Sequence, residues 1–157
     1  MSEKPRIAKI SFDERSIVRH GARFEHERKL AIYDLLEDNY FAPIGDFRGP
    51  FNLRLRVAEN HLAFDVRDQA DAKLTEFTLS LSPFHSFIKD YFIVCDSYFA
   101  AIKTSPPSKT EALDMGRRGL HDEGGEMLVG RLAGKVDINQ ETARRLFTLI
   151  CALRTGL

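Results

Sequence analysis

The residues best suited to chemistry lie in one stretch, Ser108 to Gly134, where ionisable side chains alternate with glycines. Within it, His121 follows Arg117 by four residues and Asp114 by seven, so in an α-helix all three project from one side. Arg118 lies beside them. A histidine oriented by a carboxylate can act as a general base. The stretch therefore contains candidate catalytic and ligand-binding residues on one face of a helix.

The two arginines favour a different chemistry, the binding of an anion. Positive charges next to His121 lower its pKa, which weakens it as a base at neutral pH. The guanidinium groups of Arg117 and Arg118 suit the forked hydrogen bonds that phosphates and carboxylates accept. Alternatively, the arginines pair with Asp114 and Asp122 in an exposed ion-pair stripe, which contributes only about 0.3–0.5 kcal/mol per pair.

Glu123 is a second catalytic candidate because of its place in the helical pattern. It continues the apolar stripe between Leu120 and Met127, so we expect its carboxylate to face inward, in the core or in a pocket. Gly124-Gly125 follows directly, and we expect this pair to interrupt the helix. An inward carboxylate beside such a break would suit an acid or a metal ligand.

A metal site would combine His121 or His26 with Glu123 or Glu27. Nothing in their spacing requires it, since the fold has to bring such ligands together. The sequence also lacks the glycine-rich phosphate loops, the zinc-type CxxC pair, the HExxH motif and the GxSxG motif. We therefore assign no metal ligand and expect no cofactor.

The stretch is predicted to be helical from Ser108, which is a candidate N-cap with Glu111 completing a capping box. One face of this helix is apolar or small, and we expect it to be buried: Ala112, Met115, Gly116, Gly119 and Leu120. A glycine costs about 1 kcal/mol relative to alanine inside a helix. We therefore expect another element to approach closely at Gly116 and Gly119.

The run DMGRRGLHDEG, from Asp114 to Gly124, resembles the signature of a small uncharacterised protein family of alphaproteobacteria. Other segments resemble the first helix, central strand, long helix and last helix of that family: Glu25–Arg28 with Ala31–Ile32 and Asp34–Glu37, Phe64–Asp68, Lys89–Phe92, and Thr142–Leu149. The resemblance runs nearly from end to end. It implies no activity, because the family has none assigned.

Composition limits the class of protein. A chain of 157 residues is typical of one domain, so we expect a single globular domain over residues 1–157. With 43% hydrophobic and 29% charged residues, it resembles globular rather than disordered chains. The 23 basic and 23 acidic residues balance, which argues against binding along a nucleic-acid backbone.

The two cysteines, Cys95 and Cys151, fall in apolar helical patterns. We predict that both are small buried thiols in a reducing compartment. No signal peptide is recognisable, and no segment approaches the roughly 18 consecutive apolar residues of a membrane span. We expect a cytoplasmic protein that does not contact a membrane.

Alternating patterns predict four strands, of which the last three form an antiparallel meander: Arg6–Asp13, Phe51–Val57, Leu62–Val66 and Phe77–Leu81. Helical patterns cover Phe24–Asn39, Ser82–Thr104, Ser108–Gly134 and Asn139–Leu153, and the connector Asp13–Gly21 has a possible helical turn. The aromatic-rich second helix is expected to be the central one. Lys135–Ile138 is either a turn or an edge strand. The grouping indicates an α+β fold, an antiparallel sheet of about four strands with helices on one face.

The meander has one polar face, where Arg54, Arg56, Asp65 and Arg67 fall side by side. These residues either pair across strands, at about 0.2–1 kcal/mol per pair, or form an anion-binding surface.

We hypothesise that the chain is a non-catalytic binding or regulatory module, which recognises an anionic small molecule or a protein partner through residues 114–123. The ligand-binding candidates are Arg117, Arg118, His121, His26 and Arg28. The alternative is a hydrolase- or transferase-type enzyme that uses His121 with Glu123, and Asp114 is a further catalytic candidate. Two questions stay open at this point: whether the chain is an enzyme, and whether it forms a homodimer.

Overall fold

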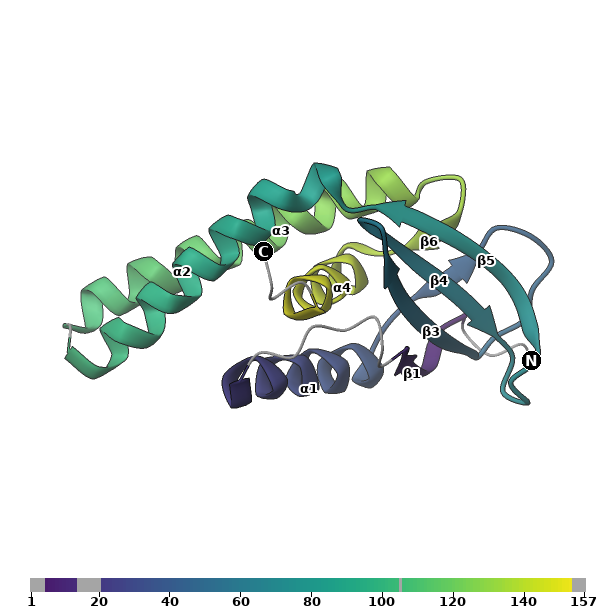
Figure 1. Cartoon of the computed structure of the whole chain (residues 1–157), viewed down its shortest axis with the longest axis horizontal. Helices are drawn as coiled ribbons and strands as arrows, with labels where there is room; N and C mark the ends of the chain where they lie inside the picture. The colour runs from purple at the N-terminus through teal and green to yellow at the C-terminus, as the bar shows by residue number, and fades with distance from the viewer. Residues whose placement is uncertain (1–4, 14–20, 105, 154–157) are drawn as a thin grey trace.

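The computed structural model describes residues 5–13, 21–104 and 106–153. The elements follow in the order β1 (Ile7–Phe12), α1 (Gly21–Glu37), β2 (Phe41–Pro43), β3 (Phe51–Ala58), β4 (His61–Arg67), β5 (Lys73–Ser80), the short 3₁₀ helix η2 (Ser82–Phe84), α2 (His85–Thr104), α3 (Pro107–Leu132), β6 (Val136–Ile138) and α4 (Gln140–Leu153). This arrangement confirms the α+β class (Figure 1). The helical turn expected at Ser16–Val18, in the connector from Asp13 to Gly21, lies outside the described residues.

The main sheet has the strand order β1-β3-β4-β5. The predicted antiparallel meander is confirmed for β3, β4 and β5, and Glu59 and Asn60, both with positive φ, form the tight turn between the first two. However, β1 pairs with β3 in parallel, so the sheet is mixed. The reason is the connection, because the chain passes through α1 before it returns to the sheet. Residues Val136–Ile138 form a strand that pairs with β2 in a second, two-stranded sheet.

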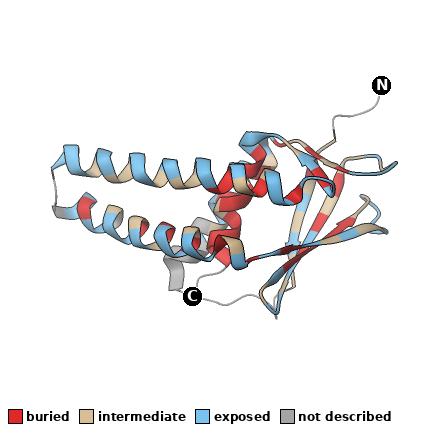
Figure 2. Cartoon of the chain, turned by 90° about the horizontal axis from the view of Figure 1, so that it is seen from above, coloured by how far each residue is buried: buried red, intermediate tan, exposed pale blue. Residues whose placement is uncertain are grey.

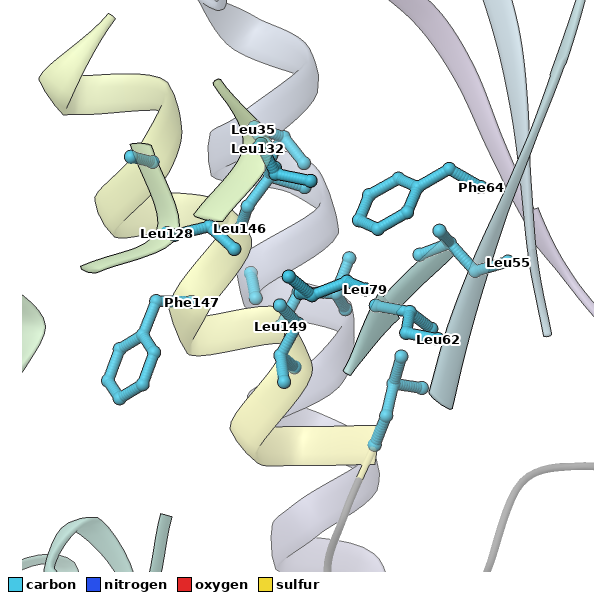
Figure 3. Close-up of a cluster of buried hydrophobic side chains, with 14 of the residues drawn as sticks. Leu35, Leu55, Leu62, Phe64, Leu79, Leu128, Leu132, Leu146, Phe147 and Leu149 are labelled. Carbon is cyan, nitrogen blue, oxygen red and sulfur yellow. The ribbon is translucent and has the colours of Figure 1, made fainter. Parts of the chain in front are cut away.

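The main sheet has one buried and one polar face, as its alternating sequence predicts. On β3, the buried Leu53 and Leu55 alternate with the exposed Arg54 and Arg56. In Figure 3, the buried side chains of the strands point toward leucines of the helices: Leu55, Leu62, Phe64 and Leu79 face Leu35, Leu146 and Leu149. The helices therefore cover one face of the sheet.

The central helix is α4, and the expectation that residues 82–104 would fill this place is wrong. Nine residues of α4 are buried: Thr142, Ala143, Leu146, Phe147, Leu149, Ile150, Cys151, Ala152 and Leu153. Helix α4 lies between α1 on one side and the pair α2–α3 on the other (Figure 1). By contrast, Ile93 and Ile102 of α2 are more than half exposed. Among the aromatic residues of α2 whose burial the structure describes, Tyr91 is buried, and the half-buried Phe87 packs against Phe147 of α4.

Helices α2 and α3 form a long hairpin that extends away from the sheet, past the ends of α1 and α4 (Figure 1). Its far end is mostly exposed or half-buried, whereas the buried residues gather where the hairpin meets α4 and the sheet (Figure 2). Among the described helices, none is both long and apolar enough to cross a membrane.

A buried polar contact joins β1 to the end of α1. The Asn39 side chain accepts a hydrogen bond from Ile7 N at 2.7 Å and donates to the carbonyl oxygens of Ile7 and Leu35. All three bonds satisfy a side chain that is 3% exposed. They fix the strand edge against α1, which in turn packs on α4.

Candidate functional site

Helix α3 is continuous through Gly124-Gly125, and the predicted interruption at this pair is wrong. Both glycines are buried against α4. A Cβ added to Gly124 would lie 2.6 Å from three ring carbons of Phe147, and one added to Gly125 would lie 3.1 Å from Arg144 N. These glycines permit the close approach of α4, and packing offsets the helix-propensity cost of about 1 kcal/mol each. The helix begins at Pro107, with no side-chain cap hydrogen bond, so the Ser108 cap is also not observed.

The orientation predicted for the first part of α3 is wrong. Met115 is 71% exposed, Ala112 is exposed, and an added Cβ at Gly116 or Gly119 would meet nothing within 4 Å. Of the predicted apolar face, only Leu120 packs partly against the core. Instead, the polar side of the helix faces the other helices, where His121 and Arg117 pack against aromatic rings of α2 and α4.

His121 shows this inward orientation most clearly. Its ring lies 5.3 Å from the Tyr91 ring of α2 and 6.2 Å from the Phe147 ring of α4, between centroids. Burial, followed by the charges of Arg117 and Arg144, lowers the pKa of His121 to about 4. The imidazole is therefore neutral at neutral pH. Its Nε2 atom is buried and has no hydrogen-bond partner.

Arg117 and Arg118 are adjacent but lie in different environments. The Arg117 guanidinium pairs with Asp114 Oδ1 at 2.8 Å and lies over the Tyr98 ring, 5.1 Å from its centroid. Its Nε is buried without a partner. The Arg118 side chain is 69% exposed and pairs with Asp114 Oδ2 at 3.0 Å. Asp114 therefore holds both arginines, and only Arg117 is directed inward.

A cavity of about 370 Å³ lies beside His121, among four helices. Its lining residues come from α1 (Leu30, Ala31, Asp34), α2 (Tyr91), α3 (Arg117, His121) and α4 (Glu141, Arg144, Arg145, Thr148). We call it the helical cavity. Three arginines and two carboxylates line it, and Asp114 and Asp122 pair with Arg117 and Arg144 from outside the lining.

Two arginines of the helical cavity, Arg144 and Arg145, were not among the candidates. Arg144 Nε lies 2.8 Å from Asp122 Oδ1, and its NH1 donates to Glu141 at 3.1 Å. Arg145 donates to the backbone oxygen of Asp38. A signal was present, because both belong to the segment Thr142–Leu149 that resembles the last helix of a known family. Helical periodicity alone does not show that this segment faces the 114–121 region.

Other candidate residues do not reach the cavity. Glu123 is exposed, so the prediction of an inward carboxylate is wrong, and it does not join His121. His26 is exposed on α1 and is not a lining residue. Arg28 lies over the Phe12 ring of β1, 5.6 Å from its centroid. The Glu27 side chain lies outside the described residues. The structure thus brings together His121 and Arg117, with Asp114 behind Arg117.

No group of three or more histidine, cysteine, aspartate or glutamate side chains is placed to hold a metal ion in the described part of the chain. Cys95 and Cys151 are both buried, and neither forms a disulfide. Burial raises the pKa of the Cys151 thiol. The polar chemistry of the helical cavity therefore comes from its arginines, carboxylates and imidazole.

The fold and the cavity define an α+β protein with a mixed-charge pocket among its helices. A family model described as an uncharacterised protein family, UPF0262, matches residues 4–156. The chain belongs to this family, which confirms the resemblance carried by the 114–124 run. No solved structure matches the chain.

Curated relatives cover almost the whole chain. The UPF0262 protein of Paramagnetospirillum magneticum is 55% identical over 153 residues, which is 98% of each chain. That of Rhodospirillum rubrum is 54% identical, over 98% of this chain and 94% of its own. The relative from Nitrobacter hamburgensis is 55% identical over 94% of this chain and 90% of its own. The names of these relatives state no activity.

Proposed function

We propose that this protein is a binding module that holds a small anion in the helical cavity. The observation that carries the proposal is the pair of buried nitrogen atoms, His121 Nε2 and Arg117 Nε, that lack hydrogen-bond partners beside this cavity. Buried polar groups in proteins nearly always have a partner, so such atoms call for one. A ligand oxygen next to them would accept the hydrogen bonds that these nitrogens can donate.

The guanidinium groups of the cavity support an anion rather than a cation. Arg117, Arg144 and Arg145 approach from two helices, and guanidinium groups bind phosphates and carboxylates through paired hydrogen bonds. Asp34 and Glu141 in the lining, with Asp114 and Asp122 behind it, balance this charge, so the guanidinium N–H donors rather than a net charge favour the anion. The neutral His121 imidazole can donate a hydrogen bond to the anion from Nε2. We therefore expect a ligand with a carboxylate or phosphate and with further polar groups near the two acidic residues.

Catalysis by His121 with Glu123 has no support from this geometry. Glu123 is exposed and does not line the cavity. A histidine with a pKa of about 4 is also a weak general base at neutral pH, because efficient bases titrate near the working pH. Binding without turnover fits the site better than acid–base chemistry does.

The test is a thermal-unfolding panel at low ionic strength with phosphate, pyrophosphate, sulfate, succinate and citrate. A bound anion raises the melting temperature of the wild-type protein, since it stabilises only the folded state. Arg117→Gln and Arg144→Gln should lose this increase. Arg118→Gln is the matched control, because Arg118 is the neighbouring arginine, also pairs with Asp114, and is 69% exposed. It should keep the increase.

Two outcomes would overturn the proposal. One is a panel in which no anion changes the melting temperature of the wild-type protein. The other is an increase that Arg117→Gln and Arg118→Gln retain equally, since that would reflect a general salt effect. A flat panel would direct the search to a protein partner, beginning with the exposed apolar residues of the hairpin, Ile93, Ile102 and Met115.

We also propose that the protein works in the cytoplasm. What supports this is that both cysteines are buried as thiols and not joined in a disulfide. Fractionation of cells that express a tagged full-length chain tests the compartment, and recovery from the periplasm would contradict it.

A further inference from the structure

The polar face of the main sheet contains a second cavity, which the helical site does not use. It has a volume of about 310 Å³ and lies over β3, β4 and β5. Arg54 and Arg56, which line it, alternate with the buried Leu53 and Leu55 on β3. The cavity therefore opens on the side of the sheet that the helices leave uncovered. We call it the sheet cavity.

Asp65, which lines the sheet cavity, has an unsatisfied oxygen. The residue is 8% exposed. Its Oδ2 accepts hydrogen bonds from Nε and NH2 of Arg67, at 3.2 and 3.0 Å. Its Oδ1 is buried and has no hydrogen-bond partner. A carboxylate oxygen in this state favours a donor, and a positively charged donor most strongly.

Two arginines without ion-pair partners among the described residues, Arg54 and Arg56, line the same cavity as Asp65. The register of the sheet places Arg54 directly across from Asp65, and Arg56 across from Ala63. Within the part of the chain that the structure describes, neither arginine forms an ion pair or a side-chain hydrogen bond. Side chains directly opposite on neighbouring strands have Cβ atoms about 4.5–5.5 Å apart. The small methyl group of Ala63 leaves space beside them.

The remaining charged residues that line the sheet cavity, Asp13 among them, already have partners. Lys73 Nζ lies 3.3 Å from Glu76 Oε1, and Arg67 is held by Asp65 and by the backbone oxygen of Asp71. The groups left without partners are therefore two guanidinium groups and one carboxylate oxygen. A ligand that satisfies them has to carry an acceptor with negative charge and a donor close to it.

We propose that the sheet cavity binds a small zwitterion of the α-amino acid class. Its carboxylate lies against Arg54 and Arg56, and its ammonium donates to Asp65 Oδ1. An α-amino acid carries these two groups on one carbon, which matches two cross-strand neighbours of opposite charge. A simple anion would satisfy the arginines but would leave the Asp65 oxygen without a donor. This site is additional to the helical cavity and does not depend on the function proposed for it.

The experiment is an NMR titration of the ¹⁵N-labelled full chain with each standard amino acid at millimolar concentration and neutral pH. We expect at least one amino acid to shift backbone amide signals of β3, β4 and β5 in a saturable way. Three derivatives of that amino acid then dissect the recognition. The N-acetyl form lacks the ammonium, the primary amide lacks the carboxylate, and the 2-hydroxy acid replaces the ammonium with a hydroxyl.

The N-acetyl and amide forms should each bind at least about tenfold more weakly than the amino acid. Arg54→Gln and Asp65→Asn should weaken amino acid binding to a similar degree. Arg54 is exposed and unpaired, so its variant should fold even if loss of the Asp65–Arg67 pair disturbs the other one. Arg117→Gln is the control, since it changes the helical cavity alone and should leave this binding intact.

The proposal is overturned if no amino acid gives a saturable shift of these amides. It is also overturned if the N-acetyl form binds as tightly as the amino acid, because the site would then read only the anion. If the 2-hydroxy acid binds as tightly as the amino acid, a neutral hydroxyl is sufficient as the donor to Asp65 Oδ1. That result would contradict the proposal that the ligand is a zwitterion. If the Arg54→Gln variant binds the amino acid as tightly as the wild type, the binding site is not the sheet cavity.

Discussion

The two halves of α3 differ in what their glycines do. In the second half, Gly124 and Gly125 are buried against α4, together with Leu128 and Leu132. In the first half, Gly116 and Gly119 are exposed, and a Cβ at either would meet nothing within 4 Å. The same residue type therefore marks close packing in one half and an open surface in the other. Burial of the neighbouring residues, not the presence of glycine, separates the two cases.

The halves also differ in where their polar residues point. The buried residues of the second half are apolar or glycine. In the first half, Arg117 lies over the Tyr98 ring and His121 lies against the rings of Tyr91 and Phe147, while Met115 is exposed. Asp114 pairs with Arg117. The second half of α3 therefore supplies stability, and the first half supplies the polar groups that α3 contributes to the helical cavity.

The largest difference between the halves is expected for the removal of an apolar side chain. Leu128→Ala should lower the free energy of unfolding by about 2–5 kcal/mol, because Leu128 is fully buried and its loss leaves a cavity. Met115→Ala should change it by no more than about 0.5 kcal/mol, since Met115 is exposed. Chemical denaturation of both variants measures this, and equal losses would show that Met115 is buried in solution.

The next effect is the pH dependence of stability that His121 contributes. Well above pH 6.5 the imidazole is neutral in both the folded and the unfolded state. As the pH falls from 6.5 to about 4, the unfolded chain binds a proton that the folded chain does not, so the folded state loses stability. The full loss is at most about 3 kcal/mol. It should be absent in His121→Gln.

Denaturation at a series of pH values, with the variant subtracted from the wild type, isolates this contribution from that of the carboxylates. His26→Gln is the matched control, because His26 is exposed on α1 and is not a cavity residue. It should behave as the wild type does. If His121→Gln keeps the full wild-type loss between these pH values, His121 is not buried in a neutral form.

A smaller effect is expected from adding a methyl group at the packed glycine. Gly124→Ala places a Cβ against the Phe147 ring, where the contact distance would be 2.6 Å. Such overpacking costs about 1–3 kcal/mol, and a better helix propensity returns part of it. Thermal and chemical unfolding measure the net loss. A variant as stable as the wild type would mean that α3 and α4 are farther apart than they are here.

The smallest effect has the opposite sign. Gly119→Ala should raise the free energy of unfolding by roughly 0.5–1 kcal/mol, because the exposed position has room for the methyl group and alanine favours the helix. Gly116→Ala should behave in the same way. Destabilisation by either substitution would indicate a partner, such as a second copy of the chain, that contacts this surface.

Much of the fold could be predicted because its strands and α1 follow simple alternation or helical periodicity. The buried Leu53 and Leu55, alternating with Arg54 and Arg56, fix the faces of β3. On α1, Ala31 and Leu35 are buried as their spacing predicts. The parallel pairing of β1 with β3 was missed because the alternation of apolar and polar residues along a strand does not show whether the neighbouring strand runs parallel or antiparallel to it.

The candidate site could be predicted only in part. His121 and Arg117 were identified from type and spacing, but the side of α3 that faces the protein depends on which surface lies opposite. Glycine and methionine suggested an apolar face, whereas the rings of Tyr91 and Phe147 favour the polar one. Arg144 and Arg145 enter the cavity from α4, and no local pattern shows that α4 packs beside α3 at this point.

The central claim is that His121 lies inside a cavity that accepts an anion. The most direct measurement is the pKa of the His121 imidazole by NMR, with and without sulfate, which stays a dianion across the range of the titration. We expect a pKa of about 4 without sulfate, and a higher value with it, because a bound anion stabilises the imidazolium. A pKa near 6.5, or one that sulfate leaves unchanged, would contradict the claim.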